Sequence, residues 1–157
     1  MEYGVQESIR LGGNRMNRAK TIIYVRVSYW VGAVIDAIVI IPMLSPSVAG
    51  TVFGISGFTP GSDYGYAMRI AASLMAGWVF LLLWADRKPV ERKGVLVLTI
   101  VPVLAGLILS GVYAVNTGFI GAEEMKLTWI MQVCLVILFG FSYFTARKLG
   151  VEKSEHK

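Results

Sequence analysis

Residues 22–44 read IIYVRVSYWVGAVIDAIVIIPML, an almost unbroken apolar run near the start of the chain. A helix needs about 20 predominantly apolar residues to cross a bilayer, and this run is long enough. Three later stretches, residues 66–85, 94–116 and 127–146, have the same length and character. We therefore predict an all-α integral membrane protein whose residues 21–147 form a four-helix bundle.

The composition of the chain agrees with a membrane protein that has one domain. Hydrophobic residues make up 55% of the 157 residues, and charged residues 16%. Soluble domains have about 25% charged residues. The apolar residues gather in four blocks separated by short connectors, which leaves no room for a second domain.

Basic residues mark the predicted orientation. Twelve of the fifteen Lys and Arg residues lie in three groups: Arg10, Arg15, Arg18 and Lys20; Arg87, Lys88, Arg92 and Lys93; Arg147, Lys148, Lys153 and Lys157. The two other connectors contain only Lys126. Cytoplasmic loops carry the excess of Lys and Arg, so both termini and the middle loop are predicted to be cytoplasmic.

This placement assigns residues 1–20 to a polar cytoplasmic leader and residues 148–157 to a charged cytoplasmic tail. It also explains the net charge of +5 without nucleic acid, since basic residues beside a membrane set topology and contact anionic lipid. The loop at residues 86–93 has a second interpretation, as a docking surface for a partner or for lipid head groups.

The connector Ser45–Pro60 is predicted to contain a short helix between the first and second spans. Ser45 suits the N-cap position and Pro46 the first helical position. Apolar and small residues then recur with helical spacing: Val48, Thr51, Val52 and Ile55. The helix is too short to cross, so we expect it in the outer interface. A re-entrant hairpin is the alternative.

Two charged residues inside the spans are candidate functional residues. Asp36 lies just beyond the middle of the first span, and Arg69 lies early in the second span. An intramembrane charge is costly and by default indicates function. Small residues flank both on their helix faces, where another helix can approach. We predict that Asp36 and Arg69 form an ion pair in the outer half of the bundle.

Each of these charges also has a simpler interpretation. Arg69 can extend its side chain to the outer interface, and Asp36 can then be satisfied by Tyr and Ser hydroxyl groups or be protonated. An ion pair, if it forms, can be purely structural, because a buried pair is weak evidence of function.

Polar residues of the third and fourth spans extend the candidate site. In the third span they recur at helical spacing along one face: Thr99, Pro102, Gly106, Ser110, Tyr113 and Thr117. Ordinary helix packing explains this stripe, and the alternative is that it lines a cavity. Gln132 lies in the outer half of the fourth span. We predict that Asp36, Arg69, Tyr113 and Gln132 converge as a ligand-binding cluster with apolar walls.

Several kinds of chemistry are not indicated. Cys134 is the only cysteine and His156 the only histidine, which excludes an internal disulfide and most zinc sites built from His and Cys. The sequence contains no phosphate loop, HExxH motif or nucleophile elbow. We predict no catalytic residue, no metal site and no cofactor, so an enzyme is the least favoured class.

The organisation of the chain resembles the DoxX-like class of small bacterial and archaeal four-helix membrane proteins. The resemblance lies in the Pro- and Gly-containing outer segment after the first span, in Arg69 early in the second span, and in the short basic loop Asp86–Lys93. It implies a multi-pass protein of a prokaryotic cell (inner) membrane. Some members are associated with redox or membrane complexes, and Cys134 gives no support to a redox role here.

Two functional hypotheses follow from the cluster. In the first, the protein is a binding or accessory membrane protein that holds a lipid-like or small amphipathic ligand, or a partner helix. In the second, it is a small transporter or channel, a homo-oligomer or part of a larger membrane complex, that uses Asp36 as a cation or proton site. Broken helices near the midplane are typical of transporters, and only Pro102 resembles such a break.

Overall fold

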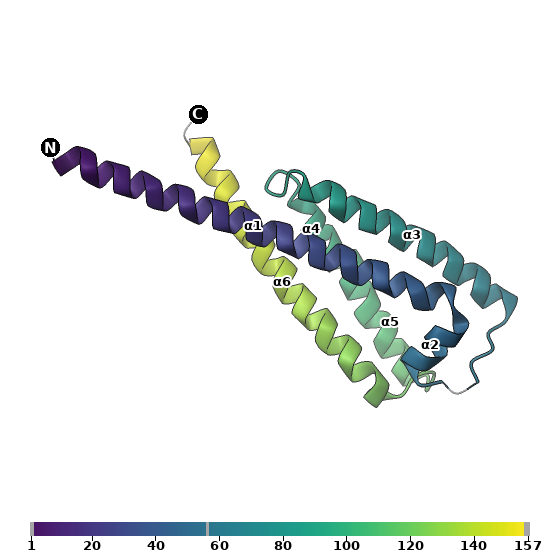
Figure 1. Ribbon diagram of the computed structural model, residues 1–157. Coiled ribbons are helices and arrows are strands. Elements are labelled where there is room, and N and C mark those ends of the chain that lie inside the picture. Colours follow the sequence, from purple (N-terminus) through teal and green to yellow (C-terminus); the bar gives the residue numbers. More distant parts are fainter. Residues whose placement is uncertain (1, 56, 156–157) are drawn as a thin grey trace.

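The chain is a bundle of long helices with one short helix between the first two spans (Figure 1). The computed structural model describes the backbone of residues 2–55 and 57–155, and the side chains of residues 18–55 and 57–149. The elements are α1 (Glu2–Leu44), α2 (Pro46–Phe53), α3 (Ser62–Asp86), α4 (Gly94–Leu98), the π-helical segment η1 (Thr99–Leu104), α5 (Ala105–Asn116) and α6 (Ala122–Glu155). Within the described backbone there is no β-strand.

Four helical segments are long and apolar enough to cross a membrane. They are Arg18–Leu44, Ser62–Asp86, Gly94–Asn116 and Ala122–Leu149. The third of these runs through α4, η1 and α5 as one span. The predicted all-α membrane bundle is confirmed, and its four predicted stretches all fall inside these helices.

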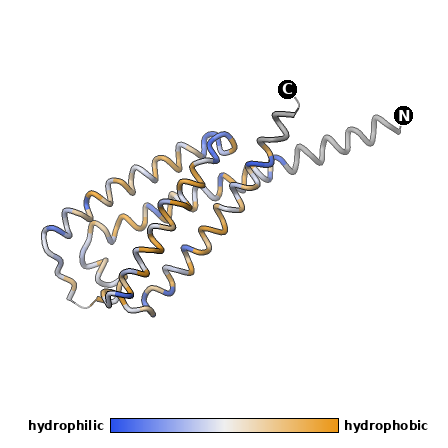
Figure 2. Tube along the Cα trace, turned by 180° about the vertical axis from the view of Figure 1, so that it is seen from behind, coloured by the Kyte–Doolittle hydropathy of each residue, from blue (hydrophilic) through white to orange (hydrophobic). Residues whose placement is uncertain are grey.

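The two ends of the bundle differ in charge. Figure 2 shows hydrophilic residues at both ends and mainly hydrophobic residues between them. One end carries both termini and the α3–α4 loop with Arg87 and Lys88, and we call it the basic end. The opposite end carries α2 and the start of α6, and we call it the α2 end. The half of the bundle nearer α2, the outer half in the predicted topology, is called the α2 half.

The core is densest in the basic half of the bundle. Its fully buried large side chains come from all four spans: Val25, Tyr29, Leu82, Leu96 and Phe139. At Gly32 the helices approach so closely that a Cβ atom would lie 2.8 Å from Cζ of Phe139 and 3.2 Å from Cδ1 of Leu82. Glycine is therefore required here by close packing of α1 against α3 and α6.

The short helix α2 begins where the sequence predicts. Pro46 occupies the first turn, and Ser45 before it has extended backbone angles. The Ser45 hydroxyl makes no capping bond but pairs with the Ser47 hydroxyl at 3.1 Å. Gly54 ends the helix in the left-handed conformation, with φ of 67°. The helix is therefore confirmed, and its position in the outer interface stays a prediction.

Pro102 lies inside η1, where the sequence predicts a kink. Proline has no backbone N–H, so it cannot donate the usual bond to the carbonyl four residues earlier. The chain accommodates this by widening into a π-helical turn, and the N–H of Ala105 then donates to the carbonyl of Ile100, five residues back. Such π turns are rare in proteins, and those that occur are often found at functional sites.

Candidate functional site

The structure places the four predicted site residues in three different environments. Gln132 is buried, with 4% of its surface exposed, on the face of α6 that meets the core. Asp36 is half-buried on the core-facing side of α1. Arg69 is exposed, and Tyr113 is 72% exposed. Asp36 and Gln132 therefore point toward the interior, whereas Arg69 and Tyr113 point away from it.

Arg69 and Asp36 form no ion pair with each other. The side of α3 that packs on α1 carries Ala72, Leu82 and Asp86, all buried. Arg69 lies instead on the exposed side of α3, together with Ser73 and other exposed residues. The small residues near Arg69 are divided between two sides of α3, because Ala72 is buried whereas Ser73 and Gly77 are exposed. Arg69 lies on the exposed side, so the expected direct pair is absent.

The polar stripe of the third span is divided by η1. Thr99 is buried and its hydroxyl donates to the Val95 carbonyl at 2.9 Å. Beyond the π turn, Ser110 and Tyr113 are exposed and Gly111 is buried instead. An α-helix advances roughly 100° per residue, and one π turn displaces the following residues by about one such step. The stripe is therefore continuous in the sequence but not in space, which moves Tyr113 away from Asp36.

Four buried polar atoms have no hydrogen-bond partner among residues 18–55 and 57–149. They are Oδ2 of Asp36, Oε1 of Gln132, Nε1 of Trp78 and Nε1 of Trp129. Burying such an atom without a partner costs about 1–3 kcal/mol. Unsatisfied buried groups are few in native proteins, and each one needs an explanation such as a bound molecule. Each of these atoms is a candidate contact for a ligand.

Contacts between α1 and α3 place Asp36 level with Trp78. The two helices are antiparallel, and Arg26 pairs with Asp86 at 2.9 Å. Six residues further along α1, Gly32 lies against Leu82. Continuing by four residues on each helix brings Asp36 opposite Trp78. One acceptor and one donor without partners therefore lie at the same level of the bundle.

Contacts between α1 and α6 place Gln132 near the same level. The hydroxyls of Ser28 and Ser142 are 2.6 Å apart, and Gly32 lies against Phe139. The same count brings Asp36 level with Leu135. Gln132 lies three residues farther toward the α2 end, about 4.5 Å along the helix axis. Both unsatisfied acceptors are thus in the α2 half of the bundle.

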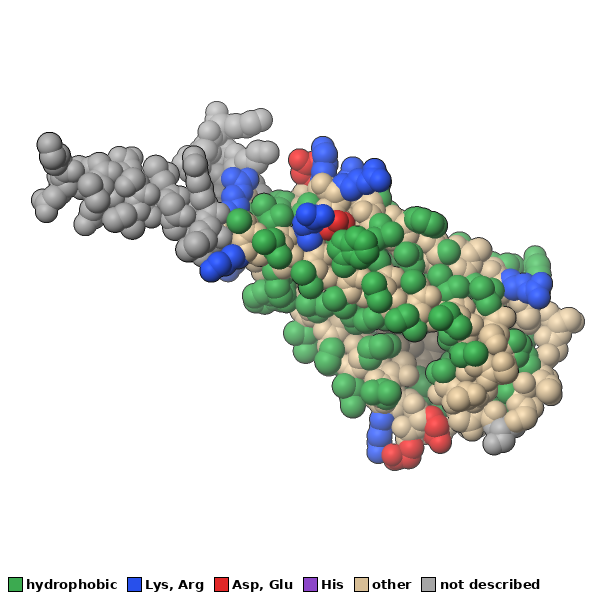
Figure 3. Space-filling model, in the orientation of Figure 1, with side chains coloured by type: hydrophobic (Ala, Val, Ile, Leu, Met, Phe, Trp, Pro, Cys, Tyr) green, Lys and Arg blue, Asp and Glu red, His purple; other side chains and the backbone are tan. Residues whose placement is uncertain are grey.

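The helices separate where these acceptors lie. In Figure 1, α1 and α6 cross in the basic half and diverge toward the α2 end. The core-facing side of α1 is buried at Tyr29 and Ala33 but only half-buried at Ile35, Asp36 and Ile40. The face shown in Figure 3 is hollowed between α1 and α2. The core side of α1 therefore lacks complete cover in the α2 half.

Helix α2 extends across the α2 end of this region. It packs against α1, and its terminal Gly54 lies against the first turn of α6, where a Cβ atom would be 3.0 Å from Cγ of Glu124. The region around Asp36 is thus bounded by α2 at one end and by the dense core at the other. Its open side faces the surroundings of the bundle laterally.

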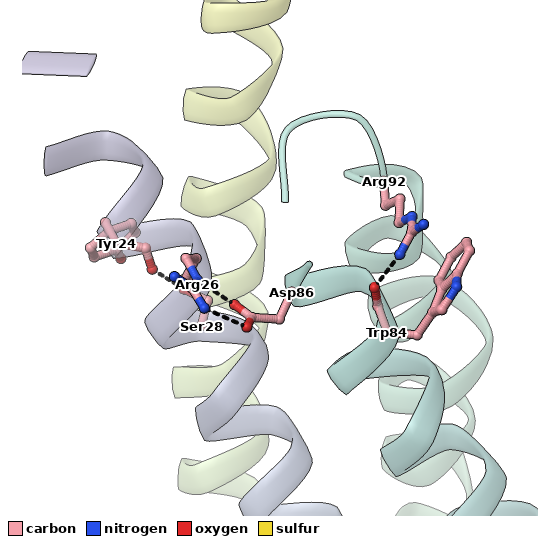
Figure 4. A network of polar contacts seen from close by, with 6 residues as sticks. All are labelled: Tyr24, Arg26, Ser28, Trp84, Asp86 and Arg92. Carbon is pink, nitrogen blue, oxygen red and sulfur yellow. Dashed lines mark hydrogen bonds and ion pairs between the residues drawn. The ribbon is translucent and has the colours of Figure 1, made fainter. Parts of the chain in front are cut away.

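A second group of polar contacts lies at the basic end (Figure 4). Nε and Nη2 of Arg26 donate to the two carboxylate oxygens of Asp86 at 2.9 and 3.0 Å. The Tyr29 hydroxyl donates to the Arg92 carbonyl at 3.0 Å. The Arg92 guanidinium donates to the Trp84 carbonyl and lies 3.4 Å from the centre of the Trp84 ring. These contacts tie α1, α3 and the α3–α4 loop together.

The ion pair of Arg26 and Asp86 is not predicted from the sequence, where Arg26 lies within an otherwise apolar run. A signal for it is present in the sequence. Arg26 lies five residues into the first stretch, and Asp86 directly follows the second. Because consecutive spans are antiparallel, these two positions fall at the same end of the bundle.

Neither metal ligands nor known relatives add a further indication. Within the described side chains, no group of three His, Cys, Asp or Glu residues is arranged to hold a metal ion. Cys134 is exposed on α6. No protein-family model, curated protein or solved structure matches this chain.

Proposed function

We propose that this protein is a membrane binding protein that receives the polar head of a small amphipathic molecule beside Asp36 and Gln132. The observation that carries the proposal is the buried amide oxygen of Gln132 without a partner, at nearly the same level as the unsatisfied carboxylate oxygen of Asp36. A ligand pocket combines apolar walls with a few placed polar groups, and this region has that composition.

The basic end supports the orientation that we propose. Exposed cations there include Arg18, Lys20, Arg87, Arg147 and Lys148. Loops rich in Lys and Arg face the cytoplasm, which places the α2 half toward the outside. With the resemblance to DoxX-like proteins, this supports a multi-pass protein of a prokaryotic cell (inner) membrane, whose site opens to the outer leaflet.

The dense core supports binding from the lipid side. Tyr29, Leu82, Leu96 and Phe139 are at most 1% exposed, and they fill the basic half below Asp36. A molecule at Asp36 is therefore separated from the basic end by packed side chains. An amphiphile with its chain in the bilayer reaches the site laterally, where α1 is incompletely covered.

Native mass spectrometry from a mild detergent tests the proposal. The wild-type protein is expected to retain an added mass in the range of a lipid-like molecule. Gln132→Leu keeps the side-chain size but removes the amide, and it is expected to lose that mass. Asn116→Leu removes an exposed amide at the end of α5 and serves as the matched control. An unliganded wild-type protein, or equal retention by both variants, would contradict the proposal.

The π-helical segment favours a second candidate function, a small oligomeric transporter or channel. Gly111 lies against Trp129 on the antiparallel α6. The same residue count brings Leu135, and hence Asp36, level with Ala105, directly after η1. A broken helix beside an intramembrane charge is typical of transporters. Cation-driven fluorescence changes in proteoliposomes that disappear in Asp36→Asn would support this function, and a flat response in both proteins would exclude it for the cation tested.

A further inference from the structure

The charge balance around Asp36 identifies the kind of head group that the site fits. Arg26, Arg69 and Lys126 are the basic residues outside the three basic groups, and they are the candidates for neutralising this carboxylate. Arg26 is committed to Asp86 near the basic end, and Lys126 is paired with Glu123 at 2.6 Å. Arg69 is on the exposed side of α3. In the described part of the chain, Asp36 forms no ion pair.

The two inward-pointing oxygens demand a donor. An ionised carboxylate only accepts hydrogen bonds, and so does the oxygen of an amide. An isolated carboxylate is very costly in an apolar environment unless a cation pairs with it or it takes up a proton. A ligand that pairs with the ionised form of Asp36 and also reaches Gln132 therefore carries positive charge and more than one N–H or O–H group.

Other head groups fit these atoms less well. A phosphate or carboxylate head group brings negative charge to a carboxylate and offers further acceptors. A neutral alcohol offers one donor and leaves the charge on Asp36 unbalanced. A metal ion needs several more oxygen ligands than these two, and no three-residue metal cluster occurs among the described side chains.

The walls of the site require that the cation be attached to an apolar body. The neighbours of Asp36 on the half-buried side of α1 are Ile35, Val39 and Ile40, and the region opens laterally. The indole N–H of Trp78, level with Asp36 and without a partner, is available to an oxygen of the same molecule.

We propose that the ligand is a lipophilic amine whose ammonium group donates to Oδ2 of Asp36 and Oε1 of Gln132. This inference rests on the proposed binding function and narrows it to one class of head group. An ammonium group has three donors and one positive charge, and it thus complements both acceptors.

Binding of three probes with the same chain length tests the inference. Decylammonium, decanol and decanoate are titrated into the protein in nanodiscs of phosphatidylcholine, and the signal of empty nanodiscs is subtracted. Decylammonium is expected to bind at least about tenfold more tightly than the other two probes, because only decylammonium can form a buried charge pair with Asp36. Asp36→Asn is expected to remove this preference. Asp63→Asn, which neutralises an exposed carboxylate at the α2 end, is expected to leave it unchanged.

Two outcomes would overturn the inference, and they differ in what they say about the binding function. In the first, decanol binds as tightly as decylammonium, with a dependence on Gln132 but not on Asp36. In that case the assignment of the ligand as an amine is wrong and the proposed binding function stands. If none of the probes binds above empty nanodiscs, the amine is again wrong. The binding function fails as well only if native mass spectrometry finds no retained amphiphile.

Discussion

Arg26 and Asp86, sixty residues apart in the chain, are joined by two hydrogen bonds of 2.9 and 3.0 Å at the basic end of the bundle. The carboxylate side chain is 9% exposed, and the arginine side chain is 53% exposed. The pair fixes the register between α1 and α3, because two such bonds define one relative position of the helices. Farther along the two helices, the close approach of Gly32 and Leu82 is what brings Asp36 level with Trp78.

Asp86→Asn is expected to lower the thermal stability of the protein. The amide offers one acceptor in place of two and carries no charge for Arg26. Because Arg26 is half-exposed, we expect a loss of only about 1 kcal/mol, or about 2–4 °C in melting temperature. Thermal unfolding in detergent measures this shift. Glu91→Gln, in the exposed pair with Lys88, is the control and should change little; an equal shift in both variants would argue against a special role for Asp86.

Gly32→Ala is expected to destabilise the bundle, although alanine is the better helix former. The added methyl group would meet Phe139 at 2.8 Å, and overpacking of this kind costs about 1–3 kcal/mol. Gly77→Ala is the matched control, since a Cβ atom there meets nothing within 4 Å. The melting temperature should fall for the first variant and stay constant or rise for the second. The reverse order would show that the helices do not meet at Gly32.

Gln132→Leu is expected to raise the melting temperature of the ligand-free protein. The change removes a buried acceptor without a partner, whose burial costs about 1–3 kcal/mol. Sites that bind ligands often give up stability in this way. Tyr113→Phe, at an exposed position, should have no effect. A fall in melting temperature for Gln132→Leu after delipidation would mean that Gln132 has a structural partner.

Membrane-impermeant thiol labelling tests the proposed topology. In a Cys134→Ala background, Ser47→Cys in α2 is expected to react in intact cells. Lys88→Cys, in the α3–α4 loop, is expected to react only after the membrane is permeabilised. Both positions are exposed in the structure, so access is limited by the membrane and not by burial. If only the Lys88→Cys variant is labelled in intact cells, the orientation of the protein is the opposite of the one proposed.

The sequence predicts the helices well because their signals are local. Length and apolarity define the spans, and Ser45, Pro46 and Gly54 define α2. Which way a span is rotated is not local. Arg69 has small neighbours that fit either a buried or an exposed face. Only the packing of α3 on α1 determines which face of α3 is buried. The prediction for Tyr113 is wrong for a different reason. Pro102 can be recognised in the sequence, but the π turn that it produces cannot, and this turn shifts every later residue around the helix axis.

Asp36 and Gln132 are the two candidate residues whose side chains lie toward the interior of the bundle. Both lie on continuous helical stretches without a proline between them and the core contacts, so the helical period carries over undisturbed. Trp78 and Trp129 also have buried polar atoms without partners. The sequence does not indicate them as candidate site residues, because tryptophan is common among the apolar residues of a span. Only the structure shows that their N–H groups are buried and have no partner.

Photolabelling with a decylamine that carries a diazirine beside its amino group tests the proposed site most directly. Peptide mapping after irradiation in nanodiscs is predicted to find the label on α1 near Asp36 and on α6 near Gln132, with displacement by excess decylammonium. Labelling that instead follows exposed positions such as Leu74 and Leu127, without displacement, would contradict a binding site in the α2 half of the bundle.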